Sequence, residues 1–186
     1  MFNSCFFNFL GYNNMHIFWV IGMKVIFLDI DGVLNSNDFF ASNHDLVKQF
    51  FKENEYDYNN VNLLVERQML DIDFTKLKML KDVIIKTDSQ VVITSSWKKL
   101  KIFPYIVKEF IAFGIPVIGY TIDNGSNRGT GIKKYLMENK VDQYVVLDDD
   151  IFPDYDEEIM DRLVKTSFYD NGLEEKHIKK MIKKLN

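Results

Sequence analysis

The sequence predicts an α/β domain with three layers and a mostly parallel central sheet. Short runs rich in Val and Ile alternate along the chain with segments of helical periodicity. These runs are continuously apolar, which is typical of strands covered on both faces. Polar clusters directly follow three of the runs. Together these observations favour a sheet with helices on both sides and a functional site at one edge.

Five runs are expected to form strands, because each is short, apolar and bounded by polar residues. They are Lys24–Leu28, Gln90–Thr94, Ile115–Ile118, Tyr144–Leu147 and Leu163–Thr166.

Four helices are expected to cover the sheet. The first follows Asp73, a good capping residue, and its apolar positions recur at steps of three and four as far as Ile85. The others span Phe103–Phe113, Thr130–Asn139 and Leu173–Leu185. Strands and helices in this order predict right-handed crossovers and a Rossmann-like arrangement.

Two segments fit this alternation poorly. Residues 36–70 predict a cap-like insertion after the first strand, able to lie over the site, with one helix around Val61–Met69. Residues 1–22 are apolar and aromatic but interrupted by Asn and His, and they contain no Lys or Arg. We expect an N-terminal extension outside the fold, before a natural start at Met23. A peripheral helix or membrane contact is the alternative. The domain itself is expected to span residues 23–186.

Composition narrows the class of protein. With 186 residues, of which 47% are hydrophobic, the chain suits one domain with a substantial core. A net charge of −4 disfavours a general nucleic-acid-coating protein but leaves a nucleic-acid end open as a substrate. The single cysteine excludes an intrachain disulfide, so we expect a reducing, cytoplasmic setting. No stable membrane insertion is expected, and the oligomeric state stays open.

The first polar cluster places Asp29 and Asp31 two residues apart as the chain leaves a strand. Strand alternation puts both carboxylates on one side, where they repel unless a cation or a proton joins them. Mg²⁺ would resolve that repulsion, and Gly32 would allow the sharp turn after them. A strand-end Asp that caps a turn is an equally good interpretation of this cluster alone.

Two further clusters follow other strands. Thr94 and Ser95 offer hydroxyls and amides to a phosphate, although the cap of a helix is the simpler interpretation in isolation. Asp148 and Asp149 end another strand, where adjacent acids are costly without a metal; a solvated acidic loop is the alternative. Because the carboxyl ends of parallel strands meet at one edge, we expect a single shared site.

Taken together, the clusters resemble the haloacid dehalogenase (HAD) superfamily. Its first motif, Asp-x-Asp-Gly after an apolar strand, is matched by residues 29–32. Its second, a strand ending in Thr or Ser, is matched at Thr94, and its fourth, paired acids after a strand, at Asp148 and Asp149. The Ser-Ser-Trp sequence at residues 95–97 looks like the small-capped HAD domains of Swiss-Army-Knife RNA-repair-type proteins.

The resemblance implies a role for each matched residue. Asp29 would be the nucleophile that forms an aspartyl-phosphate and also a Mg²⁺ ligand. Asp31 would act as general acid and then general base, with its backbone carbonyl on the metal. Thr94 and the amide of Ser95 would hold the phosphoryl group. Asp148 and Asp149 would complete the metal site, with Asp149 the more direct ligand.

The third motif departs from the family, which usually has Lys there. Arg128 stands at about the right place, and Lys133, one turn further on, is a substitute candidate for binding phosphate. An ordinary surface Arg is the alternative.

Three further residues are not assigned a catalytic role. Trp97 either packs behind the second motif or stacks on a base. His44 and His177 stand alone and are not expected to bind metal.

These expectations lead to a Mg²⁺-dependent phosphomonoester hydrolase, acting on a phosphorylated small molecule, nucleotide or nucleic-acid end. Because the resemblance puts a second Asp at residue 31, it implies phosphate-ester hydrolysis rather than dehalogenation. Two alternatives stay open: a non-catalytic binding or regulatory domain with the same fold, and a phosphotransferase that uses an acceptor other than water.

Overall fold

A computed structural model describes residues 22–54, 57, 59–123 and 127–186. Its five strands form one sheet in the order β3-β2-β1-β4-β5, and every neighbouring pair is parallel. The strands are β1 (Lys24–Leu28), β2 (Ser89–Ile93), β3 (Val117–Tyr120), β4 (Gln143–Asp148) and β5 (Leu163–Lys165). The predicted α/β class and parallel central sheet are confirmed.

The register of the three central strands aligns their carboxyl ends. Leu28 lies opposite Ile93 of β2 and Leu147 of β4. The ladder continues one step further, since the Thr94 amide donates to the Leu28 carbonyl and the Asp29 amide to the Leu147 carbonyl. The three polar clusters therefore leave the sheet at the same level.

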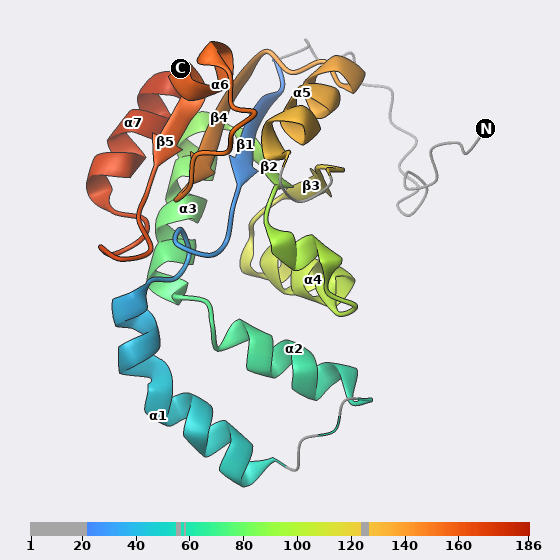
Figure 1. Cartoon of the computed structure of the whole chain (residues 1–186), viewed down its shortest axis with the longest axis vertical. Helices are drawn as coiled ribbons and strands as arrows, with labels where there is room; N and C mark the ends of the chain where they lie inside the picture. Colours follow the sequence, from blue (N-terminus) through green and yellow to red (C-terminus); the bar gives the residue numbers. More distant parts are fainter. Residues whose placement is uncertain (1–21, 55–56, 58, 124–126) are drawn as a thin grey trace, which may run out of the picture.

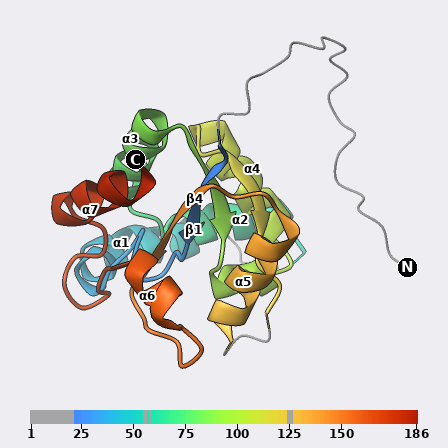
Figure 2. The same cartoon turned by 90° about the horizontal axis from the view of Figure 1, so that it is seen from above.

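Helices cover both faces of the sheet. Ile26 and Leu28 of β1 pack in a core with α3, α4 and α7, whereas Val25 and Phe27 point the other way. That second core includes side chains of α5 and α6. Figure 2 shows these two groups of helices on opposite sides of the strands, which confirms the three-layer arrangement. The helices are α3 (Phe74–Thr87), α4 (Phe103–Phe113), α5 (Arg128–Glu138), α6 (Glu157–Arg162) and α7 (Glu175–Leu185).

Local signals explain most helix boundaries. The Asp73 carboxylate accepts a hydrogen bond from the Thr75 amide at the start of α3. Gly114 ends α4 with a φ of 98°, a conformation that glycine adopts without steric cost. The next strand starts two residues later than expected, because the Ile115 amide bonds back to α4 and Pro116 has no amide hydrogen to donate. A short 3₁₀ helix, η1 (Ser96–Lys99), follows β2.

The segment after β1 forms two helices, α1 (Asn37–Glu53) and α2 (Val61–Met69). They lie beyond the end of the sheet where β1 finishes, as Figure 1 shows. Only the second was expected. The side chains of Ser36 and Asn60 cap their first turns. Whether this insertion acts as a cap stays a prediction.

The structure does not test the predicted N-terminal extension at residues 1–22. Almost all of these residues lie outside the described part of the chain, which begins at Gly22. Within the described part of the chain, no helix has both the length and the apolar character needed to cross a bilayer.

Candidate active site

Asp29 lies at the centre of the site, at the end of the middle strand. Its side chain is almost fully buried. One carboxylate oxygen accepts a hydrogen bond from the Ile30 amide at 2.8 Å, and the other accepts from Arg128 at 2.6 Å. Both oxygens are therefore held by donors, and the orientation of the carboxylate is fixed.

Three acids converge at this point. Oxygen atoms of Asp29, Asp148 and Asp149 all lie within 4.8 Å of one another. Burial, reinforced by the negative charge of Asp29, raises the pKa of Asp148 to about 6. Burial and Asp29 also raise the pKa of Asp149 above its ordinary value. We refer to these three residues as the acidic cluster.

The carboxylate of Asp149 is packed against Gly32. This glycine has a φ of 68°, and a Cβ atom built on it would lie 2.2 Å from the carboxyl carbon of Asp149. The turn after β1 therefore needs glycine both for its backbone conformation and for the approach of the third acid.

Arg128 neutralises part of the acidic cluster. Its guanidinium contacts Asp29 at 2.6 Å and Asp148 at 2.5 Å, and it lies over the ring of Phe152 at 4.3 Å. Burial alone would lower the pKa of Arg128, but the two carboxylates raise it above its ordinary value. The Tyr155 hydroxyl also donates to Asp148, at 2.9 Å. Arg128 is therefore a buried, charged part of the site and not a surface residue.

The start of α5 explains how this arginine is held. The carboxylate of Asp154 accepts hydrogen bonds from the Gly129 and Thr130 amides. These bonds extend the helix to Arg128, two residues before the predicted start.

Lys133 is not brought into the acidic cluster. Its ammonium pairs with Asp156 at 2.5 Å, and its side chain is 43% exposed.

Asp31 lies beside the acidic cluster and is held separately. Its two carboxylate oxygens accept hydrogen bonds from the Asn35 side-chain amide at 3.0 Å and the Trp97 indole at 2.9 Å. Burial raises the pKa of Asp31 above its usual range, which is the direction that suits a group that must carry a proton.

Thr94, at the end of β2 beside Asp29, has a buried hydroxyl without a partner in the part of the chain that the structure describes. It is 1% exposed, and among the described residues its Oγ1 is the one buried side-chain polar atom with no hydrogen-bond partner. Buried hydroxyls are normally paired, so this atom is available to a ligand oxygen. Ser95 is also buried, and its hydroxyl accepts from the Trp97 amide at 3.3 Å.

Lys98 supports this region and was not anticipated. Its ammonium donates to the Thr94 carbonyl at 2.8 Å and to Thr121 at 3.1 Å, and it pairs with Asp123 at 2.5 Å. It ties the end of β2 to the end of β3. The position of Lys98 four residues after Thr94, one turn along a helix, is the only sequence signal for this role.

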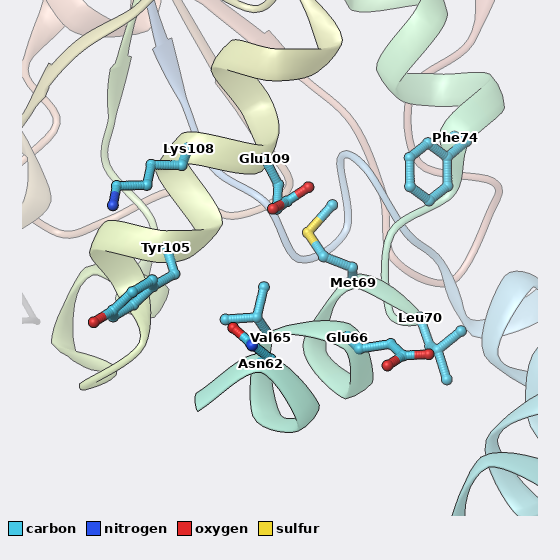
Figure 3. Close-up of a pocket in the computed structure, with 9 residues that line it drawn as sticks. All are labelled: Asn62, Val65, Glu66, Met69, Leu70, Phe74, Tyr105, Lys108 and Glu109. Atoms are coloured by element: carbon cyan, nitrogen blue, oxygen red, sulfur yellow. The ribbon is translucent and has the colours of Figure 1, made fainter. Parts of the chain in front are cut away.

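A cavity beside the insertion is a separate feature. It has a volume of about 460 Å³ and lies between α2, the first turn of α3, and α4, with walls that include Val65, Met69 and Tyr105. Figure 3 shows these side chains projecting from α2 and α4 toward the space between them. No residue of the acidic cluster lines it.

The residues present fit a Mg²⁺ ion. Carboxylate oxygens are the ligands that this cation prefers, and three come together beside an unpaired buried hydroxyl. Asp29, Asp148 and Asp149 would hold it. Of these, Asp148 already accepts hydrogen bonds from Arg128, Tyr155 and the Asp150 amide. Asp149 is therefore the freer ligand.

Comparison with known protein families identifies a match over most of the chain. The family described as the HAD domain in Swiss Army Knife RNA repair proteins matches residues 25–178. Searches of curated proteins and of solved structures gave no match. A HAD domain implies phosphoryl-transfer chemistry of the hydrolase type, and the acidic cluster is compatible with it. With most of its length matched and the expected fold and acids in place, the chain belongs to the family of HAD domains found in Swiss Army Knife RNA repair proteins.

Proposed function

We propose that this protein is a Mg²⁺-dependent phosphomonoester hydrolase that works through an aspartyl-phosphate on Asp29. The observation that supports this most is the convergence of Asp29, Asp148 and Asp149, of which Asp29 and Asp148 pair with the guanidinium of Arg128. A carboxylate attacks a phosphate dianion poorly because both are negative. A site with fixed positive charge beside the nucleophile reduces that repulsion.

The proposed reaction has two steps. In the first, an oxygen of Asp29 bonds to phosphorus, the bond to the leaving oxygen breaks, and Asp31 gives that oxygen its proton. In the second, Asp31 takes a proton from water as the water oxygen bonds to phosphorus. The acyl-phosphate bond then breaks, which releases inorganic phosphate and restores Asp29.

The other residues bind and orient the phosphoryl group. The Thr94 hydroxyl, buried and unpaired, would donate to a phosphoryl oxygen, with help from the amide of Ser95. Arg128 holds Asp29 in place and offsets its charge. Mg²⁺, when bound, supplies further positive charge against the repulsion between nucleophile and phosphate.

We further propose that the substrate is a nucleotide or a phosphorylated nucleic-acid end. The family description, which places this domain in RNA repair proteins, supports this choice. The described part of the insertion adds two helices, α1 and α2, beyond the carboxyl edge of the sheet, which would leave room for a large substrate. With its single cysteine, the enzyme is proposed to work in the cytoplasm.

A panel of substrates tests this proposal. Nucleotides, sugar phosphates, phosphopeptides, and oligonucleotides with a 3′- or 5′-phosphate are incubated with the protein, and released phosphate is measured. We expect Mg²⁺-dependent release from nucleotides or oligonucleotide ends, and its loss with EDTA. If EDTA does not change the rate of phosphate release, the metal dependence is refuted. If phosphate is released from sugar phosphates alone, the proposed substrate class is refuted.

Metal binding is expected to depend on pH. Mg²⁺ needs ionised carboxylates, and the pKa of Asp148 is raised to about 6. Below this value the metal must displace a proton.

Without metal, the folded chain holds this proton more tightly than the unfolded chain between about pH 4 and pH 6. The contribution of Asp148 to stability therefore falls as pH rises through that window.

Mg²⁺ should accordingly raise the melting temperature more at pH 8 than at pH 5. At a concentration tenfold above Kd, one site contributes about 1.4 kcal/mol, which is about 3–6 °C in a chain of this size. Thermal unfolding by circular dichroism measures the shift. Asp149→Asn should remove it and Asp150→Asn should keep it, because Asp150 is exposed and outside the acidic cluster. An equal shift at both pH values would contradict the prediction.

A further inference from the structure

We infer that Trp97 and Asn35 are positioning residues that fix the carboxyl group of Asp31 for proton transfer. The inference rests on the proposed function, in which Asp31 protonates the leaving oxygen. Trp97 donates to one oxygen of Asp31 at 2.9 Å, and Asn35 donates to the other at 3.0 Å. Two donors on different oxygens fix the plane of the carboxyl group as well as its position.

The Trp97 donor is itself rigid. Its side chain is 6% exposed and packs in the core shared by β1, β2, α3 and α4. Its backbone amide donates to the hydroxyl of Ser95 at 3.3 Å, which fixes η1 against the end of β2. The indole N–H therefore reaches Asp31 from an element that is held by the core.

Asn35 is equally constrained. It is fully buried, its side-chain oxygen accepts from the Gly32 amide at 2.8 Å, and its NH₂ group also donates to the Asp71 carbonyl at 3.2 Å. Exchanging the oxygen and nitrogen of this amide would break all three contacts, so its orientation is defined by its partners. Because Asp71 lies between α2 and α3, Asn35 also ties Asp31 to the end of the insertion.

This arrangement predicts which substrates depend on the two donors. Proton transfer from Asp31 matters when the leaving oxygen is strongly basic, as in an alkyl ester, and matters little for a nitrophenol. Loss of positioning should therefore slow the two classes unequally. A residue that only supports the fold would slow them together.

The experiment compares Trp97→Phe with the wild-type protein on adenosine 5′-monophosphate and p-nitrophenyl phosphate in single-turnover assays. Phenylalanine keeps an aromatic ring in the core and removes the N–H donor. We expect the rate with the alkyl ester to fall about tenfold or more, and the rate with the aryl ester less than about threefold. Asn35→Ser should show the same direction, and Asp31→Asn the same pattern with a larger effect.

Tyr144→Phe is the matched control, because it removes another aromatic hydrogen bond to a carboxylate, from Tyr144 to Glu158 at 3.0 Å, away from the site. It should leave both rates unchanged. Equal losses on the two esters in Trp97→Phe, or no loss, would overturn the inference while the proposed function stands. A wild-type protein inactive on both esters and on the phosphorylated oligonucleotides of the substrate panel would overturn the proposed function and this role with it.

A measurement without turnover tests the contact itself. The chain has two tryptophans, so the indole N–H resonance of Trp97 is assigned by its absence in Trp97→Phe. Asp31→Ala should move that resonance upfield, because the indole N–H then has no carboxylate to donate to. An unmoved Trp97 resonance would overturn the inference even in an active enzyme.

Discussion

Replacing Asp29 with asparagine is expected to lower the rate of phosphate release by about 10³-fold or more. Asparagine keeps the shape of the side chain and an oxygen that can accept from Ile30 or Arg128. It cannot form an aspartyl-phosphate. The rate of release from p-nitrophenyl phosphate measures the effect, and circular dichroism shows whether the fold is kept.

Asp142→Asn provides the matched control. The carboxylate of Asp142 accepts a hydrogen bond from the Met23 amide at 2.9 Å, at the opposite end of β1. This variant removes one carboxylate charge beside the same strand and should keep full activity. Turnover by Asp29→Asn at the wild-type rate would show that another group attacks phosphorus. Failure of both Asp29→Asn and the wild-type protein to release phosphate would favour a binding or regulatory domain.

Removing Arg128 is expected to have the largest effect on stability. Arg128→Ala leaves Asp29 and Asp148 buried without their cation, and breaking such a pair costs about 3–5 kcal/mol. The loss should be greater at pH 8 than at pH 5. Without the guanidinium the pKa of Asp148, already raised to about 6, would rise further, and at low pH the protonated acid needs no partner. Urea denaturation in EDTA measures the free energy of unfolding.

Two comparisons sharpen this measurement. Mg²⁺ should restore part of the lost stability of Arg128→Ala, because it neutralises the same acids. Arg162→Ala is the control, since Arg162 is only partly buried and contacts Gln143 and the Lys184 carbonyl away from the site. It should cost about 1 kcal/mol or less. Equal destabilisation by the two variants, with no dependence on pH, would mean that Arg128 does not balance the acidic cluster.

Much of the fold could be predicted from the sequence because its strands have a strong local signal. Most positions in runs such as Lys24–Leu28 are apolar, which fits a strand covered on both faces. Once those strands are parallel, Asp29, Thr94 and Asp148 must emerge at one edge. The order of the strands in the sheet is therefore enough to predict that the acids come together, and no side-chain contact has to be known.

Long-range partners could not be predicted in the same way. Helix α1 was missed because Asn and His residues interrupt its apolar pattern, and its start depends on the cap at Ser36. The bond from Trp97 to Asp31 joins residues 66 positions apart, and no spacing rule selects it. Lys133 and Arg128 are close in sequence, but only the packing of Asp154 against the start of α5 decides which one faces the acids.

Because β1, β2 and β4 end at a common level, the lengths of these three strands are strictly limited. One residue added to or removed from any of these strands would displace its polar cluster by about 3.3 Å and turn it to the opposite face of the sheet. No rotamer change repairs a step of that size. Changes of length between α1 and α2 leave the ladder untouched, because both helices lie outside the sheet. The chain thus separates a part that must keep its length, where the acidic cluster is assembled, from a part whose length can vary without moving that cluster.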